Sequence, residues 1–322
     1  MYKGYMAGLR LDVVKSTLNC SKRWARAFVP GHITGVFRIF DECGDPLHCG
    51  SVGAGFSIEA GTTTTVTIAE ASTTTVTVTY NGHVIDAPVT ETVVHEMMND
   101  YRLTAAVGVD HKSDLPIGVG FGASGAGALG TAIALGSLLD KSMPLESSAG
   151  YAHRAEVINR TGLGDVLAQT VGGVEIRTHP GGPGVGRIVR LLPPDGMRVV
   201  LAGHPGIETK SVLSDPNQRS RINDVGDRLV GNLIEQPSMA SLIDVSKEFA
   251  QSTGLMTERV KSALDDLWGA GYDWSSMVML GDSVFCFCKD SEVDAVQEVL
   301  ERHWNKSEIL VTNVSLHGGG LT

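Results

Sequence analysis

The clearest hydrophobic pattern in the chain is an alternation of apolar and polar side chains within the Thr-rich residues 62–86. Apolar side chains two residues apart lie on one face of a strand, and β-branched threonine favours extended backbone. The alternating apolar positions are Val66, Ile68, Val76, Val78 and Tyr80. An Asn81-Gly82 pair then supplies the residues of a tight turn. The segment therefore predicts strands joined as a partly exposed hairpin.

Other apolar segments predict further strands and helices. The run over residues 25–40 is interrupted by Pro30 and Gly31, which predicts a strand, a sharp turn and a second strand. Residues 128–140 predict an apolar helix, after which helical and strand-like segments alternate up to residue 192. Beyond residue 198 we expect helices near 238–252 and 257–268, a strand within 276–288, a helix over 291–303, a strand over 308–314 and a loose tail over 317–322.

The length and the spacing of turns indicate how the chain is divided. At 322 residues it exceeds what one hydrophobic core usually serves, so two domains are expected, with a single large domain as the alternative. The turn-rich residues 193–198 mark the boundary, and the mixture of helices and strands on both sides predicts an α+β fold. The expected units are an extension of unknown role over 1–24, an N-terminal domain over 25–195 and a C-terminal domain over 196–322.

The charge balance excludes one large class of partners. The chain carries 26 Lys and Arg against 36 Asp and Glu, a formal net charge of −10, and it has no cluster of basic residues. Nucleic acid is therefore not an expected partner, whereas local amides could still hold a small anion. With 42% apolar residues and no apolar run of about eighteen residues, we expect a soluble cytoplasmic protein that does not enter a membrane.

The five cysteines add a second exclusion. They show no C-x-x-C spacing and their total is odd, which argues against a disulfide framework and against a zinc site. Cys286 and Cys288 stand two residues apart in a strand-like run, so we expect both on one sheet face as small apolar residues. This cysteine usage is typical of a reducing compartment.

The segment that points most directly to chemistry is PIGVGFGASGAG at residues 116–127, called here the glycine loop, which precedes the apolar helix. Residues 120–125 match the dinucleotide pattern G-x-G-x-x-G, but no strand precedes them and Asp140 follows an uninterrupted helix. A P-loop would need Lys and then Ser or Thr where this chain has Ala126 and Gly127. Neither of these two mechanisms fits the loop.

What remains is the physical feature that those two motifs share. Small residues let backbone N–H groups converge on phosphate oxygens, and a helix N-terminus adds partial positive charge. The alternative is close packing of small residues against a neighbouring element. Five glycines together with Ser124 favour phosphate binding over that alternative, so the loop predicts a polyphosphate site.

The glycine loop resembles the second motif of the GHMP kinases, the superfamily of galactokinase, homoserine kinase, mevalonate kinase and phosphomevalonate kinase, whose pattern is P-x-x-x-G-L-G-S-S-A. Ala123 stands where the first serine of the pattern is expected, and Ser124 stands where the second is expected. The resemblance implies nucleotide binding by Pro116, Gly118, Gly120, Phe121, Gly122, Ala123, Ser124, Gly125 and Ala126.

Other segments resemble one family within that superfamily, the archaeal pantoate kinases. FVPGHITGVF at residues 28–37 is similar to the first superfamily motif, whereas of the Gly-rich third motif only Gly281 remains. Similarity to the pantoate kinases extends from about Ala25 nearly to the C-terminus and rests on five segments in the expected order. They are FVPGHITG, GSVGAGF, the glycine loop, AHRAEV with TGLGDVLAQTVGG, and SMVMLGDSVF.

This resemblance implies a two-domain GHMP kinase fold with a left-handed βαβ crossover in the N-terminal domain and a ferredoxin-like α/β C-terminal domain. The active site would lie in the cleft between them. It also implies ATP- and Mg²⁺-dependent phosphorylation of (R)-pantoate to (R)-4-phosphopantoate, a step toward coenzyme A, by direct transfer in a homodimer. Two alternatives stay open: a GHMP kinase of the mevalonate or homoserine type, or a non-catalytic nucleotide-binding homologue.

The resemblance further implies roles for three side chains. Ser124 and Glu156 are the expected Mg²⁺ ligands, because a hard cation bound to nucleotide phosphates takes few protein oxygens; Glu156 could instead be a solvated residue on a helix face. Asp165 stands where the family has an aspartate facing the acceptor hydroxyl, and we expect it to accept the hydroxyl proton. Alternatively, Asp165 is the N-cap of the helix that follows.

We expect the acceptor substrate beside the first motif. His32 would donate a hydrogen bond to acceptor oxygens or, when protonated, offset phosphate charge, unless it only bonds its own turn. Thr34 and Ser51 are weaker candidates of the same kind. GSVGAGF, at residues 50–56, is expected to be a tight turn between strands that faces the substrate pocket.

A planar guanidinium is the natural bidentate partner for the carboxylate of pantoate. Arg154 is our candidate, and Arg160 and Arg26 are alternatives that the sequence does not separate from it. Lys210 lies in a segment similar to a turn near the site in the family, so it is a further candidate for substrate binding.

Overall fold

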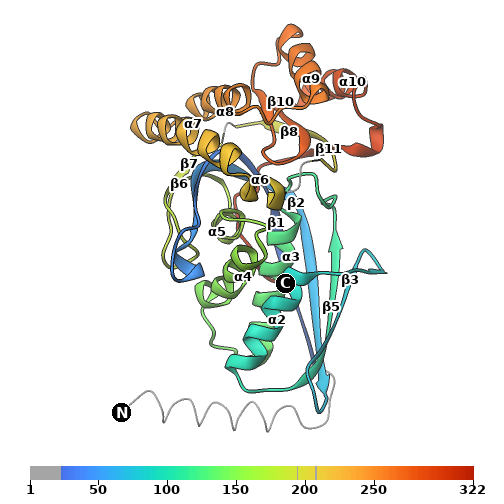
Figure 1. Cartoon of the computed structure of the whole chain (residues 1–322). Helices are drawn as coiled ribbons and strands as arrows, with labels where there is room; N and C mark the ends of the chain where they lie inside the picture. Colours follow the sequence, from blue (N-terminus) through green and yellow to red (C-terminus); the bar gives the residue numbers. More distant parts are fainter. Residues whose placement is uncertain (1–22, 194, 207–208) are drawn as a thin grey trace.

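The described part of the chain forms two β-sheets with helices packed against them (Figure 1). The residues that the computed structural model describes are 23–193, 195–206 and 209–322. Of the expected N-terminal extension, residues 1–22 lie outside the described residues, whereas Arg23 and Trp24 begin the first strand. Helices and strands are mixed throughout, which is the α+β class expected from the sequence.

The first sheet follows the order β12-β1-β2-β5-β3-β4. β6 pairs with the first part of β2, and β7 pairs with β6. The strands of this sheet are β1 (Arg23–Phe40), β2 (Gly50–Glu70), β3 (Thr75–Tyr80), β4 (His83–Val84), β5 (Ala105–Ser113), β6 (Val174–His179), β7 (Arg187–Leu191) and β12 (Gly320–Leu321). Except for the parallel pair β3 and β5, these strands pair in antiparallel fashion.

The first two strands are much longer than the sequence predicted. β1 has no sharp turn at Pro30, because its pairing with β2 continues on both sides of an irregularity between Pro30 and Gly31. Proline has no N–H to donate to the ladder and is tolerated at such a bulge. The expected turn over residues 50–56 is likewise absent, since this segment is the first part of β2.

The Thr-rich segment contains the predicted hairpin, but with a different partner for its first strand. β3 and β4 are joined through Asn81 and Gly82, with φ values of 49° and 84°, as the Asn-Gly pair indicated. β2 and β3 are not paired with each other, because β5 lies between them in the sheet. Alternation predicts which face a side chain occupies and leaves the order of the strands undetermined.

Four helices pack together beside the first sheet (Figure 1). They are α2 (Pro88–Asp100), α3 (Ala123–Leu139), α4 (Leu145–Asn159) and α5 (Asp165–Val171). α3 is buried over nearly its whole length, and its small residues allow close contact with the strands. A Cβ atom on Gly130, for example, would lie 2.5 Å from Oγ1 of Thr64 in β2.

The second sheet has the order β11-β8-β10-β9. This order is ferredoxin-like, because the last strand, β11, lies beside the first, β8, and the second, β9, lies beside the third, β10. The strands of this sheet are β8 (Met197–His204), β9 (Ser275–Met277), β10 (Asp282–Lys289) and β11 (Ile309–Thr312). The helices of this half are α6 (Thr209–Ser214), α7 (Pro216–Glu235), α8 (Met239–Thr253), α9 (Glu258–Gly269) and α10 (Val293–Leu300). α8 and α9 confirm the two helices expected there.

Two expectations for the C-terminal half were wrong. The single strand expected within 276–288 is two strands, β9 and β10, and the turn between them reaches Thr34 of β1, whose carbonyl accepts a hydrogen bond from the Met279 N–H. The tail expected to be loose forms β12, which pairs with Ala27 and Phe28. The C-terminus therefore returns to the first sheet (Figure 1).

The described cysteines fall into two pairs with different environments. Cys286 and Cys288 are free and buried in β10, as expected for small apolar residues. Cys43 and Cys49 form a disulfide, with Cα atoms 5.6 Å apart, in the loop between β1 and β2. The sequence argued against a disulfide framework, and the described cysteines form one local bridge, which an odd total does not exclude.

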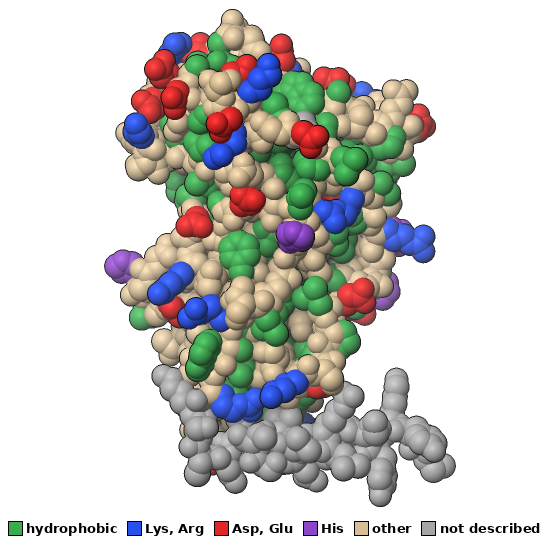
Figure 2. Space-filling model, turned by 180° about the vertical axis from the view of Figure 1, so that it is seen from behind, with side chains coloured by type: hydrophobic (Ala, Val, Ile, Leu, Met, Phe, Trp, Pro, Cys, Tyr) green, Lys and Arg blue, Asp and Glu red, His purple; other side chains and the backbone are tan. Residues whose placement is uncertain are grey.

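Two surface properties bear on possible partners. Among the described residues, no helix combines the length and the apolar character needed to cross a bilayer. On the face shown in Figure 2, basic side chains are scattered among acidic ones and form no continuous basic surface.

Candidate active site

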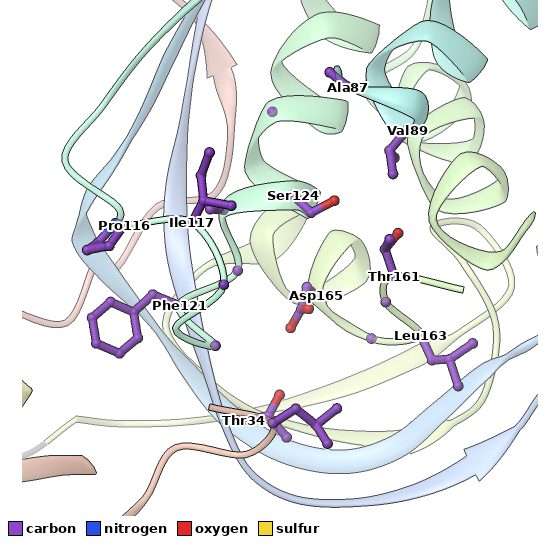
Figure 3. Close-up of a pocket in the computed structure, with 18 of the residues that line it drawn as sticks. Thr34, Ala87, Val89, Pro116, Ile117, Phe121, Ser124, Thr161, Leu163 and Asp165 are labelled. Carbon is purple, nitrogen blue, oxygen red and sulfur yellow. The ribbon is translucent and has the colours of Figure 1, made fainter. Parts of the chain in front are cut away.

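A cavity of about 670 Å³ is lined by residues of the first sheet and its helices and by residues just beyond the strand ends of the second sheet. The first sheet and its helices contribute most of the wall, while Met279 and Leu280 come from the turn between β9 and β10. In Figure 3, Ser124 and Asp165 project into the middle of this space, with Ala87 and Val89 on one side and Thr34 and Leu163 on the other. We call the side at Ala87 and Val89 and the side at Thr34 and Leu163 the two arms of the pocket.

The glycine loop needs its glycines at three alternating positions. Gly118, Gly120 and Gly122 have φ values of 80°, 84° and 72°, in the left-handed region that other residues rarely adopt. A Cβ atom on Gly122 would also lie 2.9 Å from Nε2 of Gln169 and 3.0 Å from the backbone N of His32. Positive φ and close approach together exclude larger residues there.

The loop is held through its carbonyl groups, which leaves its amides available. The Phe121 carbonyl accepts from the His32 N–H, at 3.1 Å, and the Gly122 carbonyl accepts from Gln169 Nε2, at 2.9 Å. Within the described residues, no N–H of residues 118–125 donates a hydrogen bond to the protein. Helix α3 begins at Ala123 without a side-chain cap, and Ala123 and Ser124 of its first turn line the pocket. This is the arrangement that an anion such as a phosphate requires.

Ser124 and Glu156 lie together, as the resemblance implied. Ser124 Oγ donates to Oε1 of Glu156 at 2.5 Å, and Glu156 is almost fully buried on α4. Burial and the nearby Asp165 carboxylate outweigh the hydrogen bonds and raise the pKa of Glu156 to about 7. Oε2 of Glu156 is buried and has no hydrogen-bond partner in the described residues. A hydroxyl beside an unpaired buried carboxylate oxygen is a donor set that suits Mg²⁺.

Asp165 is the first residue of α5, and Gly164 occupies the N-cap position. Its side chain makes no capping hydrogen bond, so the N-cap alternative is not observed. Oδ1 of Asp165 accepts from Nδ1 of His32 at 2.7 Å. Its side chain is 28% exposed and lines the pocket, and Oδ2 has no hydrogen-bond partner in the described residues. One carboxylate oxygen is therefore fixed and the other is open to a ligand.

His32 lies behind Asp165 and is not part of the pocket lining. It is fully buried, and its Nε2 is 2.9 Å from Oε1 of Glu175 on β6. Burial opposes the charged imidazole, but the carboxylates of Glu175 and Asp165 outweigh it and raise the pKa of His32 to about 9. Because both ring nitrogens are already occupied, the structure does not support the expected direct contact between His32 and substrate.

Sequence reasoning missed two residues of this group, Glu175 and Arg177. Arg177 Nη1 donates to Oε1 of Glu175 at 2.5 Å, and both side chains are 1% exposed. Arg177 also lines the pocket, and its Nε has no hydrogen-bond partner in the described residues. Two charges two residues apart in the otherwise apolar start of β6 were the available signal, since they share one face of a strand. We call Arg177, Glu175, His32 and Asp165 the ion line.

The opposing charges of the ion line also explain the state of Asp165. Burial opposes its ionisation, but the hydrogen bond and charge of His32 and the charge of Arg177 lower the pKa of Asp165 below its usual value. Asp165 is therefore a carboxylate at neutral pH. It can accept a hydrogen bond from a hydroxyl group placed in the pocket.

The remaining predicted residues divide into two groups. Thr34 and Ser51 line the pocket beside Asp165, as expected for contacts to a substrate. Arg154 is directed elsewhere: its Nε donates to Oε2 of Glu96 on α2, at 3.3 Å, and its guanidinium lies over the ring of Tyr151. Lys210 lies in helix α6, and its side chain is outside the described residues.

Comparisons with known proteins agree with this geometry. Residues 84–173 match the sequence model of the GHMP kinases N terminal domain. The chain is 33% identical to the pantoate kinase of Thermococcus kodakarensis over 85% of this chain and 91% of that protein. It is 31% identical to the pantoate kinase of Methanocaldococcus jannaschii, over 85% and 96%. A solved structure, a phosphotransferase related to the CoA biosynthesis pathway, matches at a TM-score of 0.82 and 30% identity, covering 93% of this chain and 99% of its own.

Proposed function

Because the chain belongs to the pantoate kinase family of the GHMP kinases, we propose that its pocket transfers the γ-phosphoryl group of ATP to the primary hydroxyl of (R)-pantoate. The product is (R)-4-phosphopantoate. One observation supports this most strongly: an ionised carboxylate, Asp165, and a buried guanidinium, Arg177, line the same pocket as the unpaired amides of the glycine loop. A kinase that acts on a hydroxy acid needs those three kinds of group.

ATP would occupy the arm of the pocket that starts at the glycine loop and runs toward the start of α2. The amides of residues 118–125 would bind the phosphates, with partial positive charge from the N-terminus of α3. The far end of this arm suits a planar base, because its walls are mainly apolar: Tyr80, Ile85, Ala87, Pro88, Val89, Thr90 and His111. Mg²⁺ would be held by Ser124 and Glu156, where it supplies positive charge to the transferring phosphoryl group.

The acceptor would occupy the other arm, beside the ion line. Its primary hydroxyl would donate to Oδ2 of Asp165, which receives the proton as the new P–O bond forms and ADP leaves. Its carboxylate would bind the open edge of Arg177, in place of the Arg154 that the sequence suggested. Thr34 and Ser51 offer hydroxyl groups to the remaining oxygens. No phosphoenzyme is needed, because donor and acceptor meet directly at the glycine loop.

Acceptor choice is the direct test of this proposal. Purified protein is given ATP and Mg²⁺ with pantoate, mevalonate, homoserine or galactose in turn, and ADP release is measured with mass detection of the product. We expect ADP release with pantoate and a product heavier by one phosphoryl group. Turnover with mevalonate or homoserine instead would assign another GHMP specificity, and ATP binding without turnover on any acceptor would identify a non-catalytic homologue.

Further features of the family complete the proposal for this chain. We propose an N-terminal domain over residues 25–195, which Arg23, Trp24 and the returning strand β12 join, and a C-terminal domain over the remainder of 196–322. We further propose that the active site lies between them and that the protein is a homodimer in the cytoplasm. Lys210 remains a candidate for substrate binding. Sedimentation analysis of the purified chain tests the dimer, since a monomer and a dimer of a 34.0 kDa chain are readily separated.

A further inference from the structure

His32 combines complete burial with two charged partners. Its Nδ1 faces Asp165 at 2.7 Å and its Nε2 faces Glu175 at 2.9 Å. An ionised carboxylate can only accept, so both contacts are hydrogen bonds when both ring nitrogens carry a proton. The imidazolium then balances one of the two carboxylates, and Arg177 balances the other. The ion line is thus neutral as a whole, with alternating charges.

The backbone around the ion line is shaped to admit it. A Cβ atom on Gly55 of β2 would lie 2.8 Å from Nε2 of His32, and one on Gly53 would lie 2.9 Å from Nη2 of Arg177. A Cβ on Gly164, next to Asp165, would lie 2.8 Å from Nε of Arg177. The glycines of GSVGAGF, which were expected to form a turn, therefore leave space inside a continuous strand for these buried side chains.

We propose that His32 is a positioning residue: as a doubly protonated imidazolium, held by Glu175, it fixes Oδ1 of Asp165 so that Oδ2 is the oxygen offered to the acceptor hydroxyl. This inference rests on the kinase function proposed above and deepens it. His32 touches neither ATP nor the acceptor. Glu175 and Arg177 contribute to the same positioning, because Glu175 accepts hydrogen bonds from both His32 and Arg177.

Several elements contribute charges to this centre. Asp165 comes from α5, Glu175 and Arg177 come from β6, and Glu156 on α4 acts on Asp165 as a like charge. Strand β2 brings glycine backbone against the imidazole and no charged side chain. Loss of the His32 proton would leave the carboxylates of Asp165 and Glu175 with one cation, Arg177, to balance them, and Arg177 bonds Glu175 alone of the two.

Two substitutions that remove the charge of His32 separate its two contacts. In His32→Asn, the short amide can place its nitrogen near the position of Nδ1 and still donate to Asp165. In His32→Gln, the longer amide reaches the position of Nε2 and contacts Glu175 instead. We expect kcat to fall by about 10-fold in His32→Asn and about 100-fold in His32→Gln, because a misplaced catalytic group has effects of that order. KM for ATP should change less than about threefold in both.

Two measurements distinguish positioning from a merely structural role. Ring ¹⁵N chemical shifts of His32 in the free wild-type protein should report two protonated nitrogens up to about pH 8, since its pKa is raised to about 9. The kcat profile of the wild type should fall above about pH 9, and this limb should be missing in His32→Asn. A structural defect would lower kcat by one factor at every pH.

Two variants of His303 are a matched control. Nε2 of His303 contacts a carboxylate oxygen of Asp266 at a distance of 3.0 Å, and neither residue lines the pocket. His303→Asn and His303→Gln should keep wild-type kcat. A neutral His32 at pH 7, or equal kcat losses in both His32 variants with an unchanged pH profile, would overturn the inference. The NMR result does not depend on the acceptor, and kcat is measured on whichever acceptor supports turnover. Failure of pantoate in the panel above is therefore distinguishable from failure of the role of His32.

Discussion

The glycine loop presents main-chain amides to the pocket, whereas the ion line presents side chains. The loop is one continuous segment, residues 116–127, whose shape follows from glycines with positive φ. The ion line brings together side chains from β1, α5 and β6, and Asp165 is 133 residues from His32 in the sequence. We propose that the glycine loop binds anions through its backbone geometry, whereas the ion line requires four ionised groups that compensate one another.

This difference determines which substitutions disrupt the glycine loop and which disrupt the ion line. A loop made of backbone tolerates no added Cβ at its strained positions, but it has no side-chain charge to lose. The ion line has enough space because of Gly53, Gly55 and Gly164, yet the loss of one ion leaves a buried partner uncompensated. Substitutions in the loop should therefore affect nucleotide binding, and substitutions in the ion line should affect the acceptor and the chemical step.

The largest effect is expected for Asp165→Asn, which removes the proton acceptor and keeps the volume. We expect kcat to fall by about 1,000-fold, the usual range for loss of a general base, with KM for ATP nearly unchanged. Steady-state ADP release gives both constants. If kcat stays within threefold of wild type, Asp165 is not the base, although the chain could still be a kinase.

Gly122→Ala should disrupt the glycine loop. The new Cβ would lie 3.0 Å from the His32 N in a residue with φ of 72°, so the loop must shift. We expect kcat/KM for ATP to fall by about 100-fold, an effect of the size expected for displaced binding groups. Gly184→Ala is the control, since Gly184 has φ of 87° but nothing within 4 Å of its Cβ position. It should share the backbone strain and the small loss of Tm without the loss of ATP affinity.

Arg177→Lys tests whether Arg177 binds the carboxylate of the acceptor. Lysine keeps a charge near Glu175 but loses the planar edge that matches a carboxylate, so KM for the acceptor should rise by about 10- to 100-fold. KM for ATP should be unchanged. Arg154→Lys serves as the comparison, because Arg154 pairs with Glu96 outside the pocket, and an equal rise in acceptor KM there would refute the choice of Arg177.

A separate effect, on stability and not on activity, concerns a second buried histidine, which packs against the helix that follows the glycine loop. His111 is 2% exposed and contacts the hydroxyls of Thr64 and Thr90, and burial lowers its pKa to about 4. The unfolded chain binds a proton near pH 6.5 and the folded one does not, so the contribution of His111 to stability is lost as pH falls from about 6.5 to 4. The difference should reach roughly 3 kcal/mol.

Denaturant unfolding of the wild type and His111→Gln over this pH range measures that difference directly. The variant should lack the part of the acid destabilisation that belongs to His111. His32 should show no such loss in the same range, because its pKa is raised and its stabilising charge is present below about pH 9. Parallel curves for wild type and His111→Gln would contradict the neutral state of His111.

The sequence was most informative where function depends on local backbone. The sequence singled out the glycine loop, Ser124, Glu156 and Asp165, which the structure brings close together, and it predicted helices α8 and α9. The pairing of strands that are far apart in the sequence could not be predicted from it. The unbroken β1 and β2, the position of β5 between β2 and β3, and the return of β12 all depend on strands far apart in the chain.

The site residues show the same limit. Arg154 was chosen because it flanks Glu156, yet a helix turns its neighbours to different faces, and Arg154 meets Glu96 on α2. Arg177 was overlooked because a charged residue in a strand is normally exposed, and burial of this one depends on Glu175 and on space left by glycines of β2. His32 was placed against substrate because its two carboxylate partners could not be seen.

What the chain determined by itself is a loop with unpaired backbone amides, since the φ values that open those amides are available to glycine and are encoded within twelve neighbouring residues. What the tertiary structure decided is the charge state of the side chains around it. A histidine in a sequence can be neutral or cationic, and the carboxyl group of an Asp or Glu can be a protonated acid or an ionised base. The groups that folding buries against it set the outcome, because Coulomb interactions in a dry interior depend on distance in space and not on separation along the chain.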